Sequence, residues 1–214
     1  MTYSVKEIFL TLQGEGGQAG RAAVFCRFTG CNLWTGREED RAKAVCQFCD
    51  TDFIGTDGDG GGKFETADTL ADAILSQWPE NPLTSSTPGL VVFTGGEPLL
   101  QLDATLIDAM HKRGFSIAVE SNGTVVAPAG IDWLCISPKA GSTLEQTSGT
   151  ELKLVFPQPG LDPASLSKLD FKHFWLQPMD GPNQSTNIQA AIAYCMTHPQ
   201  WGLSLQTHKL TGIP

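Results

Sequence analysis

The sequence contains no long basic run and no long apolar run. Lysine and arginine number 14 against 23 acidic residues, so the net charge at pH 7 is −9. Proteins that bind nucleic acid or anionic membrane surfaces depend on clustered Lys and Arg, and we therefore expect neither partner. A membrane-spanning helix needs roughly 18 or more consecutive apolar residues, and we expect none here. The N-terminus lacks a basic segment followed by an apolar one, so we expect a cytoplasmic protein without a secretory signal.

The cysteines also lack the pattern of a disulfide framework, which is typical of small secreted domains. Six cysteines occur in the chain. Cys26, Cys135 and Cys195 each stand alone within an apolar run, and we expect them to be buried structural thiols. The others lie closer together, in the spacing C-x14-C-x2-C. In a reducing compartment such clustering indicates a metal site or a catalytic site.

Strands and helices are predicted to alternate along the chain. Apolar segments bounded by glycine and proline predict strands at residues 22–28, 90–94, 115–121, 133–137, 152–156 and 174–178. Apolar residues at helical spacing predict helices at residues 66–78, 102–114 and 185–199. This order is typical of an α/β protein with a parallel sheet. Because a complete eight-fold barrel takes about 250 residues, we expect one domain over residues 1–214, a shortened and partly open barrel of (βα)6 type.

The clustered cysteines, Cys31, Cys46 and Cys49, are one ligand short of a structural zinc site, which four protein ligands close. No histidine precedes His111, so a fourth zinc ligand would have to come from a distant segment, and this alternative stays open. A [4Fe–4S] cluster suits the triad better, because three thiolates leave one iron free for a small-molecule ligand. On this interpretation the three cysteines hold a cluster that also binds a cofactor.

The triad, with the aromatic Phe48 before its last cysteine, resembles the signature of the radical S-adenosylmethionine (SAM) superfamily. Its spacing exceeds the usual C-x3-C-x2-C by eleven residues, but a longer loop adds only ~0.6 kcal/mol of closure entropy per doubling. The segment VVFTGGEPLL, from Val91 to Leu100, resembles the SAM-binding turn of that superfamily. Two glycines there allow the backbone to approach the amino group of SAM. The expected fold is then a radical SAM barrel.

Four further segments carry a more specific resemblance: EIFLTLQGEGGQAGRAAVFCRFTGCNL, CDT after the triad, SPK, and QPMDGP near the end. Together they resemble the 7-carboxy-7-deazaguanine synthase family. The resemblance implies a lyase of queuosine and 7-deazapurine biosynthesis that converts 6-carboxy-5,6,7,8-tetrahydropterin to 7-carboxy-7-deazaguanine. A radical derived from SAM would remove hydrogen from C6, the ring would contract, ammonia would leave, and SAM would be regenerated. The resemblance also implies Mg²⁺, a homodimer and a reducing electron donor such as flavodoxin.

The resemblance places the SAM-binding residues in loops that follow strands, where α/β barrels hold their ligands. These residues are Phe48, Cys49, Asp50, Gly96, Glu97, Ser137, Pro138, Lys139, Gln177, Pro178, Met179 and Asp180. Thr51 is implied as the magnesium residue, which suits an ion that keeps several waters in its octahedron. From residue type alone, loop capping explains the polar residues and a helix or turn cap explains Thr51.

The residues implied for the pterin are Leu12, Gln13, Gly14, Glu15, Arg27, Thr94 and Pro214. Gln13 and Glu15 can form hydrogen bonds with the donors and acceptors at the edge of the flat ring. Arg27 can bind the substrate carboxylate with its planar guanidinium, and a surface ion pair is the alternative for it. The resemblance places the carboxylate of Pro214 in the site, although the ordinary expectation for a terminus is fraying.

Two other functions fit parts of this pattern. A glycyl-radical activase is another radical SAM enzyme with short cysteine and GGEP motifs, but the QGEG segment and the compact C-terminal region argue against it. A zinc-stabilised binding module without catalysis would use the same cysteines as structural ligands. Iron and sulfide analysis separates the module from both enzymes.

Overall fold

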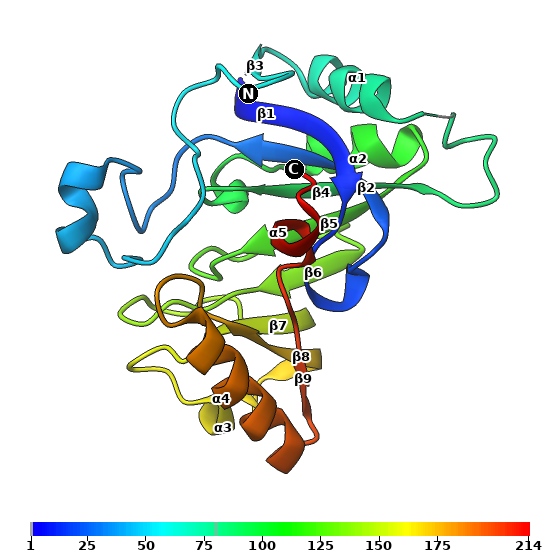
Figure 1. The fold of residues 1–214 in the computed structure, drawn as a ribbon. Coiled ribbons are helices and arrows are strands. Elements are labelled where there is room, and N and C mark those ends of the chain that lie inside the picture. Colours follow the sequence, from blue (N-terminus) through cyan, green and yellow to red (C-terminus); the bar gives the residue numbers. More distant parts are fainter. Residues whose placement is uncertain (1, 80) are drawn as a thin grey trace.

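One mixed sheet of nine strands runs through residues 2–79 and 81–214, the part of the chain that the computed structural model describes (Figure 1). The strands are β1 (Tyr3–Leu12), β2 (Ala22–Phe28), β3 (Gly62–Phe64), β4 (Gly89–Gly95), β5 (Phe115–Ser121), β6 (Trp133–Ile136), β7 (Ser148–Phe156), β8 (Asp170–Pro178) and β9 (Trp201–Leu203). Their order in the sheet is β3-β1-β2-β4-β5-β6-β7-β8-β9. Strands β2 and β4 to β9 are parallel, and β1 and β3 add an antiparallel edge.

The predicted α/β class and parallel sheet are confirmed. All six predicted strands are present, although β7 and β8 begin earlier than expected. Neither β3 nor β9 pairs on its outer side with another described strand, so the sheet stays open. Met1 and Glu80, which the prediction for residues 1–214 includes, lie outside the described residues.

Three strands were not predicted. In β1 the pairing register shifts between Val5 and Glu7, and such an irregularity interrupts the alternation by which a strand is recognised. The adjacent charged side chains of Lys6 and Glu7 also reduce the apolar signal. Strands β3 and β9 have three residues each, which is too short to show a periodic pattern.

The helices are α1 (Ala67–Gln77), α2 (Ala104–Lys112), α3 (Pro163–Leu166), α4 (Gln184–Thr197) and α5 (Thr207–Thr211), with 3₁₀ turns η1 (Gly16–Gln18), η2 (Glu38–Lys43) and η3 (Pro98–Leu100). The three predicted helices are α1, α2 and α4. Thr66 caps α1, since its hydroxyl accepts the Thr69 N–H at 3.1 Å. Residues 122–132 and 137–147, which are fully described, connect β5 to β6 and β6 to β7 without a helix. Strict alternation of strand and helix is therefore wrong for the middle of the sheet.

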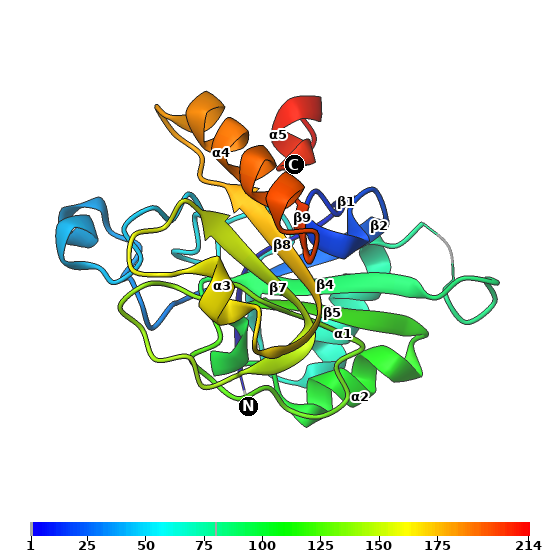
Figure 2. The ribbon, with the colours of Figure 1, turned by 90° about the horizontal axis from the view of Figure 1, so that it is seen from below.

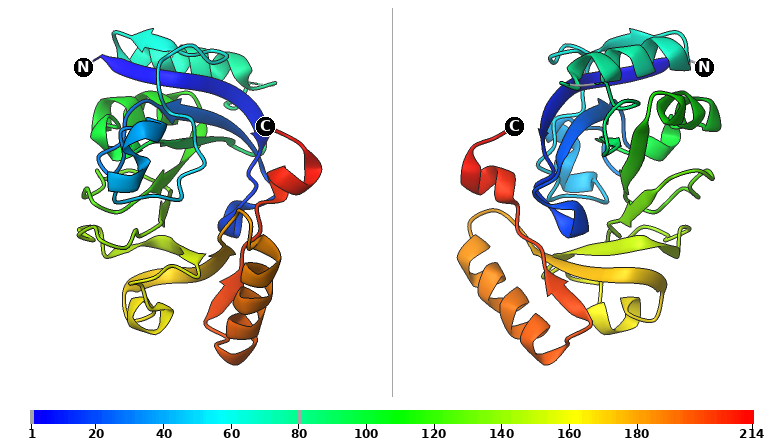
Figure 3. Two further views of the ribbon diagram at one scale, coloured as in Figure 1. Left: turned by 60° about the vertical axis from the view of Figure 1, so that its left-hand side comes forward. Right: turned by 90° about the vertical axis from the view of Figure 1, so that its right-hand side faces the viewer.

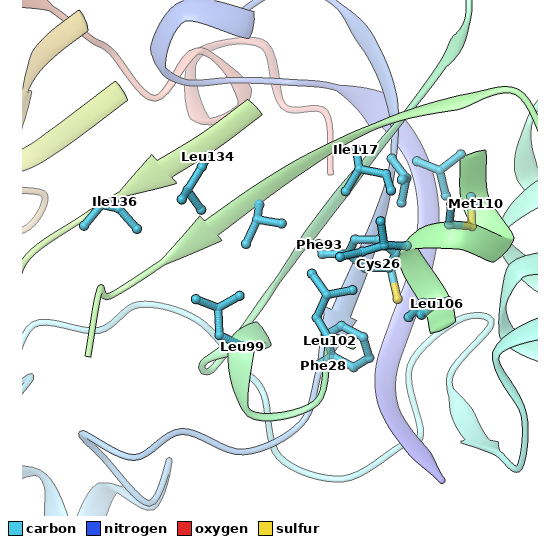
Figure 4. Close-up of a cluster of buried hydrophobic side chains, with 14 of the residues drawn as sticks. Cys26, Phe28, Phe93, Leu99, Leu102, Leu106, Met110, Ile117, Leu134 and Ile136 are labelled. Carbon is cyan, nitrogen blue, oxygen red and sulfur yellow. The ribbon is translucent and has the colours of Figure 1, made fainter. Parts of the chain in front are cut away.

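One face of the sheet is apolar and covered by helices. Figure 2 shows α1 and α2 together beside β4 and β5, while α4 lies along β8. Cys26, Phe93 and Ile117 project from the strands into this layer, where Leu106 and Met110 of α2 meet them (Figure 4). All five are fully buried. Burying a side chain of this size contributes roughly 1.5–3 kcal/mol, so this layer is the main source of stability.

The other face carries a smaller apolar cluster around Leu90 and Val92 and, nearer the carboxyl ends of the strands, polar residues, because alternate positions of a strand point to opposite faces. Arg27 lies between Cys26 and Phe28 of the apolar layer, and it pairs with Thr94 on β4. Further along the sheet, Glu120, Lys153 and Gln177 hold comparable positions near the carboxyl ends of β5, β7 and β8. The sheet is strongly curved (Figure 3), and these polar side chains line the cavity at the carboxyl ends of its strands.

No helix among the described residues is long and apolar enough to cross a membrane. This agrees with the absence of long apolar runs from the sequence.

Asp103 joins the edge of the sheet to the helical layer, and its loss is expected to cost more than that of an ordinary helix cap. Its Oδ1 accepts the Leu106 N–H at 3.0 Å and the Tyr3 hydroxyl at 2.8 Å. Asp103→Ala should therefore lower the free energy of unfolding in urea by about 2 kcal/mol. Asp108→Ala, on the exposed side of α2, should change it by less than about 0.5 kcal/mol. Equal urea midpoints for the two variants would contradict this role.

Candidate functional site

A cavity of about 410 Å³ opens at the carboxyl ends of the parallel strands. We call it the central cavity. Its volume falls in the range of roughly 300–1,000 Å³ that is usual for small-molecule sites. Its walls come from the β1–β2 turn, from the ends of β2, β4, β5, β7 and β8, from the cysteine loop and from the C-terminal segment. Residues that are far apart in the sequence therefore meet at one position.

Most of the predicted site residues line the central cavity. They are Leu12, Gln13, Gly14, Glu15, Arg27, Cys31, Cys46, Phe48, Cys49, Asp50, Thr51, Thr94, Gly96, Ser137, Lys139, Gln177, Pro178, Met179, Asp180 and Pro214. Glu97 and Pro138 do not line it. The Glu97 carboxylate is fully buried and accepts the N–H groups of Leu99 at 3.0 Å and Asn122 at 2.7 Å. Its side chain therefore fixes the turn, and burial raises the pKa of its carboxyl.

The three clustered cysteines face the same part of the cavity. Sγ of Cys31 accepts the Leu33 N–H at 3.4 Å, although burial raises the pKa of this thiol. A hydrogen bond from Cys46 lowers the pKa of Cys49 to about 6, which favours a thiolate there at neutral pH. Within the described chain, no three His, Cys, Asp or Glu side chains converge closely enough to hold one metal ion. Three thiols spread over a cavity wall suit a group larger than one ion, such as an iron–sulfur cluster.

The insertion between Cys31 and Cys46 forms a loop whose two ends meet at Leu33, and we call this loop the closed excursion. The Leu33 carbonyl accepts the N–H groups of Val45 at 3.1 Å and Cys46 at 3.5 Å. Arg41, in η2, stacks over the ring of Trp34 at 4.1 Å. Its Nη1 donates to the carbonyls of Gln47 at 2.9 Å and Cys49 at 3.0 Å. The extra residues therefore support the C-x2-C segment.

The Gly95–Gly96 turn packs directly against the loop that carries Cys31. A Cβ on Gly96 would lie 2.0 Å from the Gly30 carbonyl oxygen and 2.8 Å from Cys31 Cβ. A Cβ on Gly95, where φ is +137°, would lie 2.2 Å from the Phe28 carbonyl oxygen. The predicted reason for these glycines was access for a ligand. The structure adds a second reason, the close approach of two backbones.

Lys139 is half-buried at the wall that it shares with Cys46 and Cys49. Its Nζ donates to the Ser137 carbonyl at 2.6 Å and to the Ser137 hydroxyl at 2.7 Å. Burial lowers the pKa of this ammonium, and the nearby cysteine sulfurs act in the opposite direction. Lys139 thus supplies positive charge where negative thiolates would gather.

Arg27, a predicted substrate residue, already has a partner, whereas the helix cap considered as the alternative for Thr51 is not found. Nε of Arg27 donates to Glu7 Oε1 at 2.7 Å, so the ion pair expected as the alternative is present, while the side chain still lines the cavity. Thr51 caps no helix, because the described segment from residue 44 to residue 61 contains none. Both residues remain available to the cavity.

Sequence reasoning missed a group of charged and polar residues that also line the cavity: Glu120, Lys153, Gln206, His208 and Lys209. For Lys153 a signal existed, because a lone lysine within the apolar strand LKLVF requires a buried partner. Glu120 had a weaker signal at the end of FSIAVES. The remaining three lie in a C-terminal segment without any periodic pattern. Cys26 and Cys135 are buried as predicted, whereas Cys195 is only half-buried. Cys135 nevertheless faces the charged groups of Lys153 and Glu151.

The C-terminal segment after β9, residues 204–214, crosses the open side of the sheet toward β1, and we call it the C-terminal strap (Figure 3). The Thr207 N–H donates to the Gly14 carbonyl at 3.0 Å. Nζ of Lys209 donates to Asp50 at 2.6 Å and to Asp180 at 2.5 Å. At its end, the Thr11 hydroxyl donates to the carbonyl of Pro214 at 2.9 Å. The expectation of a frayed terminus is therefore wrong for this chain.

Comparison with known proteins was made over the whole chain. The 7-carboxy-7-deazaguanine synthase of Caulobacter vibrioides is 66% identical over 214 residues and covers all of both chains. The synthase of Bordetella pertussis is 62% identical with the same coverage. The crystal structure of QueE from Escherichia coli aligns with a TM-score of 0.66 at 25% identity, over 96% of this chain and 94% of that one. No protein-family model matches the chain.

The open, largely parallel sheet and the three-cysteine cavity at its carboxyl ends place the protein among the radical SAM enzymes. Full-length identity of this degree specifies the family further. The chain belongs to the 7-carboxy-7-deazaguanine synthase family. Enzymes of this family are lyases that use a [4Fe–4S] cluster, SAM and Mg²⁺.

Arg41 is expected to hold the C-x2-C segment in place. Arg41→Ala removes two hydrogen bonds to backbone carbonyls and the stack on Trp34. Amide hydrogen exchange over residues 44–51 should become faster by roughly tenfold, while the core strands keep their protection. Arg37→Ala is the matched control, because its side chain is 70% exposed. Unchanged exchange in the Arg41 variant would show that the excursion does not support the cysteines.

Proposed function

We propose that this protein converts 6-carboxy-5,6,7,8-tetrahydropterin to 7-carboxy-7-deazaguanine with loss of ammonia. One observation carries the proposal: the cysteine triad, the glycine turn and the predicted pterin residues line a single cavity in a chain of this family. The net charge of −9 agrees with a small-molecule substrate rather than a nucleic acid.

Cys31, Cys46 and Cys49 are proposed to ligate the cluster. The donor set fits, because thiolates are the usual ligands of iron–sulfur clusters and the conditions around Cys49 favour the thiolate. The Leu33 N–H and the ammonium of Lys139 stabilise negative charge on the sulfurs. Gly96 keeps the neighbouring wall free of a side chain.

SAM is proposed to bind along the same wall. The contacting residues are Phe48, Cys49, Asp50, Gly96, Ser137, Lys139, Gln177, Pro178, Met179 and Asp180, with Glu97 and Pro138 acting through backbone or position. Asp50 and Asp180 both accept hydrogen bonds from the ammonium of Lys209. The C-terminal strap thus holds these two proposed SAM-binding residues in position. When bound, the reduced cluster and SAM supply the radical that removes a hydrogen atom from the substrate.

The pterin is proposed to lie between β1, β5 and the C-terminal strap. The side chains of Gln13 and Glu15, with the backbone of Leu12 and Gly14, read the ring, and Thr94 approaches it from β4. Arg27 binds the substrate carboxylate through the Nη N–H groups of its guanidinium, since Glu7 accepts from Nε. The hydroxyl of Thr51 is the proposed protein ligand of Mg²⁺, with substrate and water filling the other positions.

Several broader features belong to the same proposal. Strands β2 and β4 to β8 would form the shortened (βα)6-type barrel of a radical SAM domain that includes the whole chain, with β9 as an addition. A reducing electron donor such as flavodoxin would reduce the cluster, and two copies would form a homodimer in the cytoplasm. Every described helix packs on the one sheet or its connections, which supports a single domain.

Turnover by the purified protein tests the proposed function. Anaerobically reconstituted enzyme should hold about four iron and four sulfide per chain and, with a reductant and SAM, form the deazapurine from the carboxy-tetrahydropterin without net loss of SAM. Cys31→Ala should lose both the cluster and turnover, whereas Cys195→Ala, on α4, should retain both. About one zinc per chain without sulfide would support the non-catalytic module instead. A full cluster without deazapurine formation would refute the pterin as substrate and leave other radical SAM reactions open.

The position of Pro214 predicts that the C-terminus does not tolerate extension. Four alanines added after Pro214 should raise the KM for the pterin by roughly tenfold or more, because the bond from Thr11 to the Pro214 carbonyl and the terminal charge would be displaced. SAM affinity should stay constant. The same four residues added before Met1 are the control. Equal KM values for both extensions would exclude a role for this carboxylate.

A further inference from the structure

Lys153 brings a positive charge into the interior of the central cavity. Its side chain is only 4% exposed, and it lies on β7 between Leu152 and Leu154, which point into the apolar layer. A buried ammonium is strongly unfavourable unless it is paired and hydrogen-bonded. A methionine or leucine would fill such a position more simply, so the charge requires an explanation.

Two carboxylates from different elements meet this ammonium. Nζ of Lys153 donates to Glu15 in the β1–β2 turn and to Oε1 of Glu120 on β5 at 3.3 Å. An amide also holds each carboxylate: Gln206 donates to Glu15 at 3.0 Å, and Gln13 donates to Glu120 at 2.9 Å. Lys153 thus joins three elements and serves two carboxylates at once.

The other ionisable groups near this trio already have partners or stay uncharged. Glu151 accepts the Gly17 N–H at 2.8 Å and the Trp175 indole N–H at 2.9 Å. Lys139 is bound by Ser137. Burial keeps the thiol of Cys135 protonated by raising its pKa, and His208 of the C-terminal strap adds to the stabilisation of ionised Glu15. Only Lys153 is shared between Glu15 and Glu120 among the described contacts.

The balance of charge in this trio favours an ionised Glu15. Burial by itself would raise the pKa of Glu15, but the charge and hydrogen bond of Lys153, together with the hydrogen bond from Gln206 and the charge of His208, lower it. Burial would likewise lower the pKa of Lys153, but Glu120 and Glu15 raise it well above the ordinary value. Without the lysine, Glu15 would lose this cation while its burial remained, and burial favours the protonated form of a carboxyl.

We propose that Lys153 is a positioning residue that keeps Glu15 ionised and holds Glu15 and Glu120 in place at the cavity, so that together they accept the N–H groups of the pterin ring. This inference rests on the proposed function, because it takes the pterin as the substrate. A carboxylate accepts two donors, whereas a protonated carboxyl presents a donor of its own. Lys153 therefore determines which edge of a flat heterocycle the site recognises, without touching it.

The experiment compares three variants across a pH range. Lys153→Met removes the charge at similar volume, Lys153→Arg keeps it, and Lys172→Met removes an exposed lysine on β8 as the matched control. We expect Lys153→Met to raise the KM for the pterin by roughly ten- to a hundredfold, with kcat less affected. Its KM should rise further as the pH is lowered from about 9 to about 6, because without the ammonium the burial of Glu15 favours its protonated form. Lys153→Arg should recover most of the affinity and the flat pH profile of the wild type, and Lys172→Met should match the wild type.

SAM binding separates positioning of the pterin from general damage. The shift that SAM produces in the electron paramagnetic resonance spectrum of the reduced cluster should be the same in all these proteins. A Lys153→Met enzyme with wild-type KM at every pH would overturn the inference, and so would an equal loss of SAM binding. If Lys153→Met does not fold, Glu120→Gln serves instead: it should raise the KM by roughly tenfold with SAM binding unchanged, and a wild-type KM would overturn the inference. Absence of turnover in the wild type would instead refute the proposed function.

Discussion

The close contact between two backbone turns is the constraint on which the cavity depends. The turn after β4 approaches the end of β2 so closely that neither Gly95 nor Gly96 has room for a Cβ. The Glu97 N–H donates to the Gly30 carbonyl at 2.9 Å, which fixes the turn one residue before Cys31. Because β2 and β4 are parallel neighbours, both turns lie at the same edge of the sheet. The position of the first cysteine is therefore set by the sheet itself.

Charge in the interior is arranged in two separate groups around this edge. Near the cysteines, Lys139 is the cation, and its hydrogen bonds to Ser137 hold it in place. Near the β1–β2 turn, Lys153 serves the carboxylates of Glu15 and Glu120. The first group suits a negatively charged cluster, and the second suits a ring with several N–H donors. Lys209 of the C-terminal strap binds Asp50 and Asp180 at the wall of the central cavity. The two groups of charges face the same cavity.

The sequence predicts those parts of the structure that have a periodic apolar pattern or a local motif. The parallel strands, the three long helices and the cysteine and glycine motifs all have periodic or local signals, and they are found where expected. The segments that escaped prediction have a physical reason to do so. A bulge interrupts β1, β3 and β9 are very short, and the C-terminal strap owes its order to long-range contacts such as that between Thr207 and Gly14.

The same distinction holds for the site. Motif residues such as Cys46, Thr94 and Asp180 could be placed in the cavity from their sequence context. Glu97 belongs to the glycine turn beside the cavity, but its carboxylate accepts the N–H groups of Leu99 and Asn122 and does not line the cavity. Lys153 and Glu120 were missed because neither belongs to a motif. Their importance becomes visible only when folding brings them within 3.3 Å of each other.

The closed excursion between Cys31 and Cys46 has a consequence for how such proteins are recognised and how they diverge. Because the chain departs from Leu33 and comes back to it, residues can be gained or lost in between without displacing either sulfur. Evolution can therefore alter the number of residues separating two ligands while their arrangement in space is preserved. A search pattern that demands a constant interval between cysteines would overlook this chain, whereas one that allows a variable interval and requires the paired glycines would find it.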